Sequence, residues 1–134
     1  MTRLIVGTDG PETSEVLLDY LEATVGDGDA VYVINSHIGG DETDATEMEA
    51  GEAALETLEE GLAATGATVE IHQYVRGNAP AEDLIAAADE FDADEYVIGV
   101  RKRTPLGKVV FGSTAQNLLL DAEVPVRCVP LIRD

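Results

Sequence analysis

The sequence predicts an α/β fold in which helices cover both faces of a parallel β-sheet. Five short apolar segments rich in β-branched residues alternate with four segments whose apolar residues recur at helical spacing. The strand segments are apolar throughout, which is typical of strands buried on both faces. No repeat, low-complexity tract or linker divides the 134 residues. We therefore expect one domain over residues 1–134, with right-handed crossovers.

The first half of the chain supplies two strands and two helices. A β-branched run over residues 3–8 leads into a turn, and a helix follows with Thr13 or Ser14 as its cap. Residues 31–34 form a second buried strand, which polar residues close. Over residues 48–62 apolar side chains step by three and four positions while glutamates occupy the other faces, which predicts the clearest helix.

A third strand and a third helix follow. Residues 68–75 alternate and are β-branched, and Pro80 stands where a helix can begin. This helix has an apolar face, and Asp83 is expected with three other acids on its outer side. Residues 96–99 form the fourth strand.

A helix and an edge strand complete the alternation. The helix runs from residue 112 through residue 121, and Ser113 with Gln116 fits a capping box at its start. Residues 126–132 form the fifth strand. Pro130 cannot donate a ladder hydrogen bond, so this strand is expected at an edge of the sheet or in irregular pairing.

The net charge is strongly negative: 8 basic against 27 acidic residues give −19. A chain this acidic repels nucleic acid and anionic membranes, so neither is expected as a partner. The acids are spread over the predicted helices, which favours a halophilic protein and predicts greater stability in molar KCl than in dilute buffer. With no membrane-length apolar run and no signal peptide, the protein is expected to be cytoplasmic.

The residue types that most often carry chemistry do not form a catalytic or metal-binding pattern. Cys128 is the single cysteine, which excludes an internal disulfide, and we expect it to be a core thiol of the last strand. His37 and His72 lack metal-ligand spacing. Ser113 has neither a nucleophile elbow nor a histidine placed to activate it. We therefore predict no catalytic residue and no metal site.

One segment reverses the sign of the charge. Residues 96–120 contain no acid and carry four cations, so this segment is +4 while the remainder of the chain is 4 − 27 = −23. Such a segment can form an anion site, most naturally for phosphate. Alternatively it is a basic loop that pairs with neighbouring carboxylates.

Two segments occupy the position where ligands bind in open α/β sheets, beyond the carboxyl ends of the strands. Residues 7–10 follow the first strand, and residues 99–114 follow the fourth. The second segment combines a glycine at the strand end, the cations, and a glycine followed by hydroxyls at a helix start, where free N–H groups favour phosphate. The Walker A pattern and the GxGxxG pattern both fail here.

A fixed spacing links the fourth strand to the fourth helix: Gly99-x2-Lys102-x9-Gly112-Ser113. It resembles the G-x2-G-x9-G-[S/T] nucleotide loop of the universal stress protein family. The resemblance extends over essentially the whole chain through residues 6–10 with Ser14, residues 77–81, Asp94, and residues 124–126.

This resemblance implies a Rossmann-like sheet of five parallel strands in the order 3-2-1-4-5, of the adenine nucleotide alpha hydrolase-like type. It implies an adenine nucleotide, ATP or AMP, with or without Mg²⁺, bound between the first and fourth strands. It also implies a homodimer, joined through the fifth strand at residues 126–132.

The resemblance also assigns roles to residues. It places Asp9 near the ribose and Ser36 beside the adenine through its backbone. Ribose and phosphates would be held by Gly99, Gly112, Ser113 and Thr114, and the candidate cofactor-binding set is completed by Gly7, Thr8, Arg101 and Lys102. Lys102 stands where the motif has its second glycine, and a lysine there either clashes with the ligand or contacts the phosphates itself.

Three functions follow from these observations. The first is a cytoplasmic stress-response regulator or sensor that binds an adenine nucleotide and is no dedicated enzyme, with at most a weak ATPase activity. The second is a homodimeric interaction module of the same fold that binds no nucleotide, which Lys102 favours. The third is a slow nucleotide hydrolase or phosphotransferase. The downstream protein partner is not indicated by the sequence.

Overall fold

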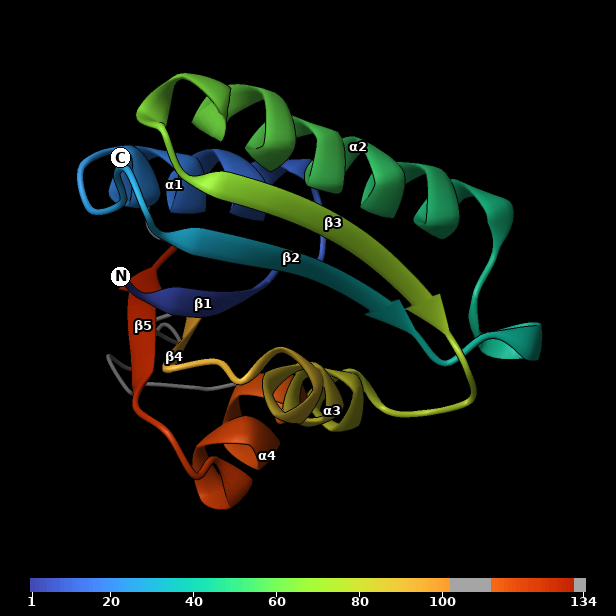
Figure 1. Ribbon diagram of the computed structural model, residues 1–134. Coiled ribbons are helices and arrows are strands. Elements are labelled where there is room, and N and C mark those ends of the chain that lie inside the picture. The colour runs from blue at the N-terminus through green and yellow to red at the C-terminus, as the bar shows by residue number, and fades with distance from the viewer. Residues whose placement is uncertain (102–111, 132–134) are drawn as a thin grey trace, which may run out of the picture.

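The computed structural model describes residues 1–101 and 112–131, and its five parallel strands form one sheet in the order β3-β2-β1-β4-β5 (Figure 1). The predicted fold class and strand order are therefore confirmed. The strands and helices are β1 (Arg3–Gly7), α1 (Pro11–Glu22), β2 (Ala30–His37), α2 (Ala45–Leu62), β3 (Thr68–Val75), α3 (Pro80–Phe91), β4 (Glu95–Val100), α4 (Ser113–Asp121) and β5 (Val126–Pro130).

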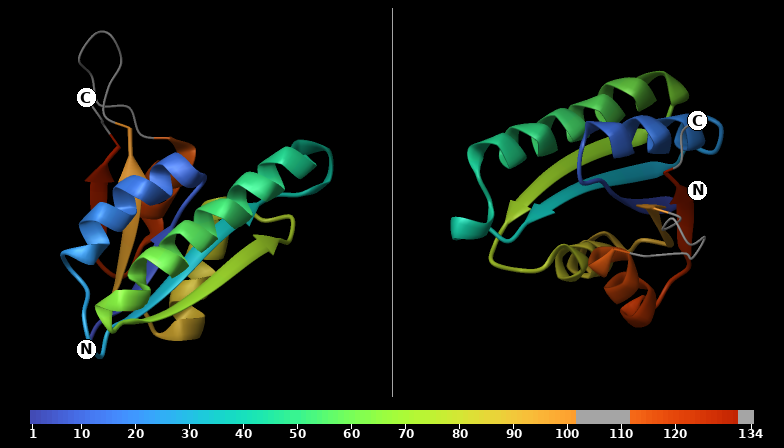
Figure 2. Two further views of the ribbon diagram at one scale, coloured as in Figure 1. Left: turned by 90° about the horizontal axis from the view of Figure 1, so that it is seen from above. Right: turned by 180° about the vertical axis from the view of Figure 1, so that it is seen from behind.

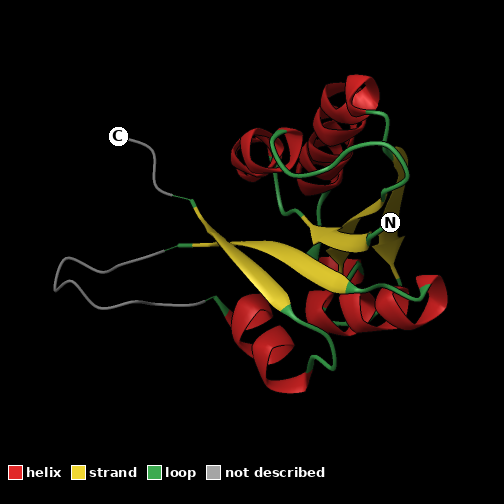
Figure 3. Cartoon of the chain, turned by 60° about the vertical axis from the view of Figure 1, so that its left-hand side comes forward, coloured by secondary structure: helices red, strands yellow, loops and turns green. Residues whose placement is uncertain are grey.

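Each face of the sheet carries its own apolar core, because successive strand side chains point to opposite faces. On one face Leu4 and Val6 of β1 pack with the leucines of α1 and α2. On the other face Ile5 of β1 packs with α3 and α4, together with Ile98 of β4. Figure 2 shows the two helix pairs on opposite sides of the sheet, and Figure 3 shows the helices flanking the twisted strands. None of the helices in the described ranges is long and apolar enough to cross a membrane.

The beginnings of two helices differ from the prediction. Helix α1 starts at Pro11 with Gly10 as its N-cap, so Thr13 and Ser14 lie in its first turn and are not caps. The reason is that proline at the first helical position has a backbone angle that already suits a helix. Helix α4 has Gly112 as its N-cap, with no side-chain capping hydrogen bond, so the predicted capping box of Ser113 is wrong. Ser113 is already the first helical residue and lies one position too late to cap.

Two further side chains lie elsewhere than expected. Asp83 was expected on the outside of α3 but is fully buried, because donors from the neighbouring segments meet its carboxylate. Cys128 was expected in the core but is exposed. It lies on the edge strand β5, where the neighbouring residue Val129 takes the position that faces the core.

The second strand is longer than predicted. It runs from Ala30 to His37, and every one of its residues pairs in register with β3, from Ala30 with Thr68 to His37 with Val75. The polar residues expected to close the strand are therefore part of it. This extension carries Ser36 to the end of the sheet where the strands' carboxyl termini meet.

Candidate functional site

A cavity of about 120 Å³ lies at the carboxyl ends of β1, β2 and β4, beside the first turns of α1, α3 and α4. This is the point where the strand order reverses, because β2 and β3 follow β1 on one side and β4 and β5 lie on the other. The cavity is lined by Gly7, Thr8, Asp9, Thr13, Ile34, Ser36, Pro80, Leu84, Ile98, Gly99, Thr114, Ala115 and Leu131.

Two glycines keep the strand ends open. A Cβ atom on Gly7 would lie 3.2 Å from both methyl groups of Leu84, in the wall of the cavity. A Cβ atom on Gly99 would lie 2.6 Å from a methyl group of Leu131. A side chain at either position would therefore press on Leu84 or Leu131, which both line the cavity.

Buried polar contacts fix the loop between β1 and α1. The hydroxyls of Thr8 and Ser14 lie 2.7 Å apart, and Ser14 Oγ donates to the carbonyl of Ala54 in α2. Asn35 Nδ2 donates to the carbonyl of Thr8 at 2.9 Å. Both hydroxyls and the Asn35 amide are buried, so leaving any of them without a partner would be costly. The backbone at the cavity entrance is thereby held in one arrangement.

Asp9 lies at the outer end of this loop. Its Oδ1 accepts a hydrogen bond of 2.6 Å from the Thr13 hydroxyl, which orients the carboxylate at the start of α1. Its Oδ2 lies 3.9 Å from a guanidinium nitrogen of Arg101, and both side chains are more than two-thirds exposed. Such an exposed ion pair contributes little stability, so both groups are free to be re-paired by a ligand.

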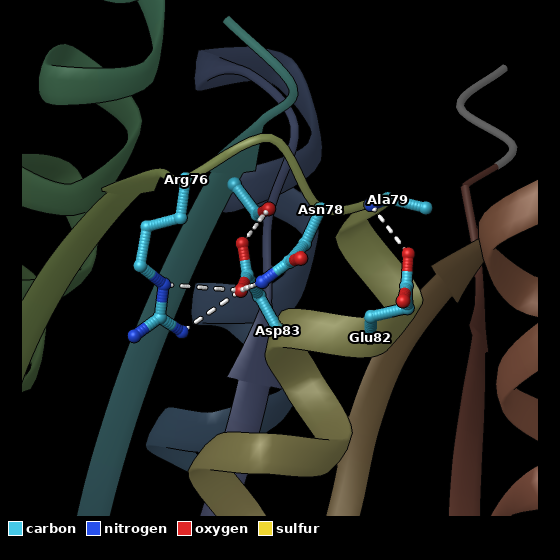
Figure 4. A network of polar contacts seen from close by, with 6 residues as sticks. Arg76, Asn78, Ala79, Glu82 and Asp83 are labelled. Carbon is cyan, nitrogen blue, oxygen red and sulfur yellow. Dashed lines mark hydrogen bonds and ion pairs between the residues drawn. The ribbon is translucent and has the colours of Figure 1, made fainter.

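Helix α3 forms one wall of the cavity, and the hydrogen bonds of its buried Asp83 carboxylate hold the start of this helix in place (Figure 4). Asp83 Oδ1 accepts hydrogen bonds from Arg76, at 2.8 and 3.3 Å, and from Asn78 Nδ2 at 3.0 Å. Asp83 Oδ2 accepts from the Ser36 hydroxyl at 2.6 Å. One side chain thus ties the end of β2 and the loop after β3 to the first turn of α3.

The ionisation of Asp83 follows from these contacts. Burial alone would raise the pKa of its carboxyl, but the hydrogen bonds from Ser36, Asn78 and Arg76 outweigh burial and hold the pKa below its usual value. The hydrogen bond that Arg76 donates to Asp83 in turn raises the pKa of Arg76. Asp83 is therefore a charged acceptor at neutral pH, although its side chain is buried.

Helix α4 provides another part of the cavity wall. Its N-cap is Gly112, and Thr114 and Ala115 of its first turn line the cavity. The first N–H groups of any helix have no partner within that helix, and the helix dipole makes this end positive. A negatively charged group in the cavity would therefore be stabilised here.

Most of the predicted site residues are brought together. Those that line the cavity are Gly7, Thr8, Asp9, Ser36, Gly99 and Thr114. Gly112 and Ser113 begin α4 beside it, whereas Arg101 lines an adjoining hollow with Asp9. Lys102 lies outside the described residues, as do Arg103 and Lys108, the other cations of this segment besides Arg101.

Sequence patterns do not reveal the apolar part of the cavity. Ile34, Leu84 and Ile98 line it, and their residue type and spacing indicate ordinary core positions. Leu131 follows the last strand and gives no signal of its own. The position of Ile98, one residue before Gly99 at the end of a predicted strand, is the single local hint, since strand ends meet at this edge.

The fold is that of a doubly wound α/β protein with a cavity at its topological switch point, which is where open α/β sheets bind their ligands. Comparison with known proteins then shows the family: the model of the universal stress protein family matches residues 1–130, and the chain belongs to that family. A universal stress protein from Mycolicibacterium smegmatis is 41% identical over 97 residues, which make up 72% of each chain.

Solved structures of universal stress proteins also superpose on this chain. The structure of a universal stress protein from Archaeoglobus fulgidus superposes with a TM-score of 0.77 at 33% identity, over 96% of this chain and 98% of that one. Another structure of the universal stress protein from that organism, in complex with dAMP, gives a TM-score of 0.69 at 28% identity over the same shares of both chains.

Proposed function

We propose that this protein binds an adenine nucleotide, ATP or another, in the cavity between β1 and β4, and acts as a stress-response regulator or sensor in the cytoplasm. The observation that carries the proposal is the position of the cavity, with an apolar wall on one side and the start of α4 on the other. The A. fulgidus relative in complex with dAMP supports an adenine nucleotide as the ligand.

The residues around the cavity fit the parts of such a ligand. Ile34, Leu84 and Ile98 offer an apolar wall to a base, and Ser36 lies at its edge. Asp9, whose carboxylate is exposed, would accept hydrogen bonds from ribose hydroxyls. The start of α4, residues 112–114, would hold the phosphates through its N–H groups.

The cations and Mg²⁺ would supply the remaining phosphate contacts. Arg101 lies next to Asp9 and can turn from that exposed ion pair to a phosphate. Lys102 follows Arg101 directly, and we propose that it contacts the phosphates itself in place of the motif glycine. The four cations at residues 101–108 would balance a ligand that the rest of this acidic chain repels.

Titration calorimetry tests the proposal. The protein is freed of bound nucleotide under denaturing conditions, refolded, and titrated with ATP and Mg²⁺ in molar KCl, which screens the repulsion among its acids. We expect saturable binding of about one nucleotide per chain. No binding up to millimolar ATP would contradict the proposal and favour the interaction module of the same fold.

We also propose that the protein is a homodimer joined through β5. This strand is an edge of the sheet, and Cys128 on it is exposed. An uncovered strand edge presents unpaired backbone groups that favour association with a second copy. Light scattering in molar KCl is expected to give twice the 14.2 kDa mass of one chain, and a monomeric mass would rule this arrangement out.

A further inference from the structure

The Ser36 side chain connects the cavity to the buried Asp83 carboxylate. Ser36 lines the cavity, and its Oγ lies 2.6 Å from Asp83 Oδ2. On β2 it shares a sheet face with Ile34, two residues earlier, which also lines the cavity. The Ser36 hydroxyl therefore stands at the boundary between the ligand space and a fixed negative charge.

The contacts of Asp83 determine where the Ser36 proton points. Asp83 Oδ1 accepts from the Arg76 guanidinium and from Asn78, so the carboxylate is held in its charged form. A charged carboxylate can accept hydrogen bonds but cannot donate one. The single Ser36 hydroxyl proton must therefore point to Asp83 Oδ2. Toward any other group, Ser36 Oγ can only accept a hydrogen bond.

We propose that Asp83, as a positioning residue, fixes Ser36 Oγ as a hydrogen-bond acceptor at the cavity, so that the cavity selects a 6-aminopurine over a 6-oxopurine. This inference rests on the proposed nucleotide site. The 6-amino group of adenine donates hydrogen bonds and matches an acceptor. The 6-oxo group of hypoxanthine or guanine accepts, and against Ser36 Oγ it would leave two acceptors facing each other without a proton.

The test compares two probes, ATP and ITP. They differ in the group at the 6-position, which is amino in ATP and oxo in ITP, and in the proton that ring atom N1 carries only in ITP. Calorimetry in molar KCl gives the affinity of each for the wild type, Ser36→Ala and Asp83→Asn. We expect the wild type to prefer ATP by about 10- to 100-fold, the range that an unpaired polar group costs.

Both variants are expected to lower the preference for ATP by about tenfold. Ser36→Ala removes the hydrogen-bond acceptor and therefore lowers the affinity for ATP more than the affinity for ITP. In Asp83→Asn the amide can donate to Ser36, which frees the hydroxyl proton to face the cavity, so ITP binds more tightly than it does to the wild type. A loss of protein stability alone would lower the affinities for ATP and ITP equally and would leave the ratio of the two affinities unchanged.

Glu82→Gln is the matched control, because Glu82 precedes Asp83 on α3, is exposed, and accepts from the Ala79 N–H without contacting Ser36. Its ATP-to-ITP ratio should equal that of the wild type. An unchanged ratio in Ser36→Ala, with ATP still bound, would overturn this inference and leave nucleotide binding intact. No binding of either probe to the wild type would overturn both. If Asp83→Asn fails to fold, Ser36→Ala decides, because it keeps the contacts of Asp83 with Arg76 and Asn78.

Discussion

Asp83→Ala is expected to lower the free energy of unfolding by about 3 kcal/mol. The side chain is fully buried and accepts hydrogen bonds from Ser36, Arg76 and Asn78, which all lose their partner together. Arg76 is 46% exposed and regains water, so the loss is smaller than for a fully buried ion pair. Urea unfolding in molar KCl measures the change.

The control for this prediction is Asp89→Ala, an exposed acid on the same helix, which should change the free energy of unfolding by less than about 0.5 kcal/mol. If Asp83→Ala and Asp89→Ala had the same small effect, the Asp83 contacts would not hold this wall of the cavity.

The contribution of Asp83 to the free energy of unfolding depends on pH in a direction that its pKa predicts. The pKa of Asp83 in the folded protein lies below its value in the unfolded chain, about 3.9. Its charged form therefore stabilises the fold above about pH 4, and this contribution is lost as the pH falls through the folded pKa. The stability difference between the wild type and Asp83→Asn should narrow as the pH falls below about 4.

Gly7→Val is expected to weaken nucleotide binding by about 100-fold or more, which corresponds to about 2.7 kcal/mol. The added side chain would project toward Leu84 and Ile98 and occupy the space between the strand end and α3. Overpacking should also cost about 1–3 kcal/mol of stability, so calorimetry is run after cooperative unfolding has been confirmed.

Gly26→Val is the matched control, because a Cβ atom at Gly26 meets nothing within 4 Å and the residue lies in the loop between α1 and β2. Ala115→Leu, which fills the cavity from α4, serves if Gly7→Val does not fold. Wild-type affinity in a folded Gly7→Val or Ala115→Leu variant would show that the nucleotide does not enter this cavity.

The fold was predictable because its signals are local. Each strand is a short apolar run, and the stripe on α2 repeats at helical spacing. The strand order came from the family resemblance, since alternation alone allows several orders. The errors at the two helix starts were also local: Pro11 begins α1 earlier than its hydroxyl residues suggested, and Gly112 caps α4 without a side chain.

The buried position of Asp83 could not be predicted from α3 alone, where an acid normally faces water. It follows from donors on other segments, and Ser36 lies 47 residues away in sequence. The nearer donors, Arg76 and Asn78, are five to seven residues before it and were the available signal. A cation and an amide in the loop before a helix can satisfy a carboxylate on its inner face.

The polar part of the candidate site could be predicted from the sequence, whereas its apolar part could not. Glycines at strand ends and hydroxyls at a helix start were predicted from their position beyond the strands and from the family resemblance, and Gly7, Gly99 and Thr114 do line the cavity. The apolar wall formed by Leu84 and Ile98 was missed, because a leucine in a binding site and a leucine in a core look alike in sequence.

The central claim is that an adenine nucleotide occupies the cavity between β1 and β4. A crystal structure of the protein grown with ATP and Mg²⁺ from molar KCl tests it most directly. We predict the base against Ile34 and Leu84, with its 6-amino group toward Ser36, and the phosphates at the start of α4. A nucleotide bound at another surface, or a cavity that holds no nucleotide at saturating ATP, would contradict this claim.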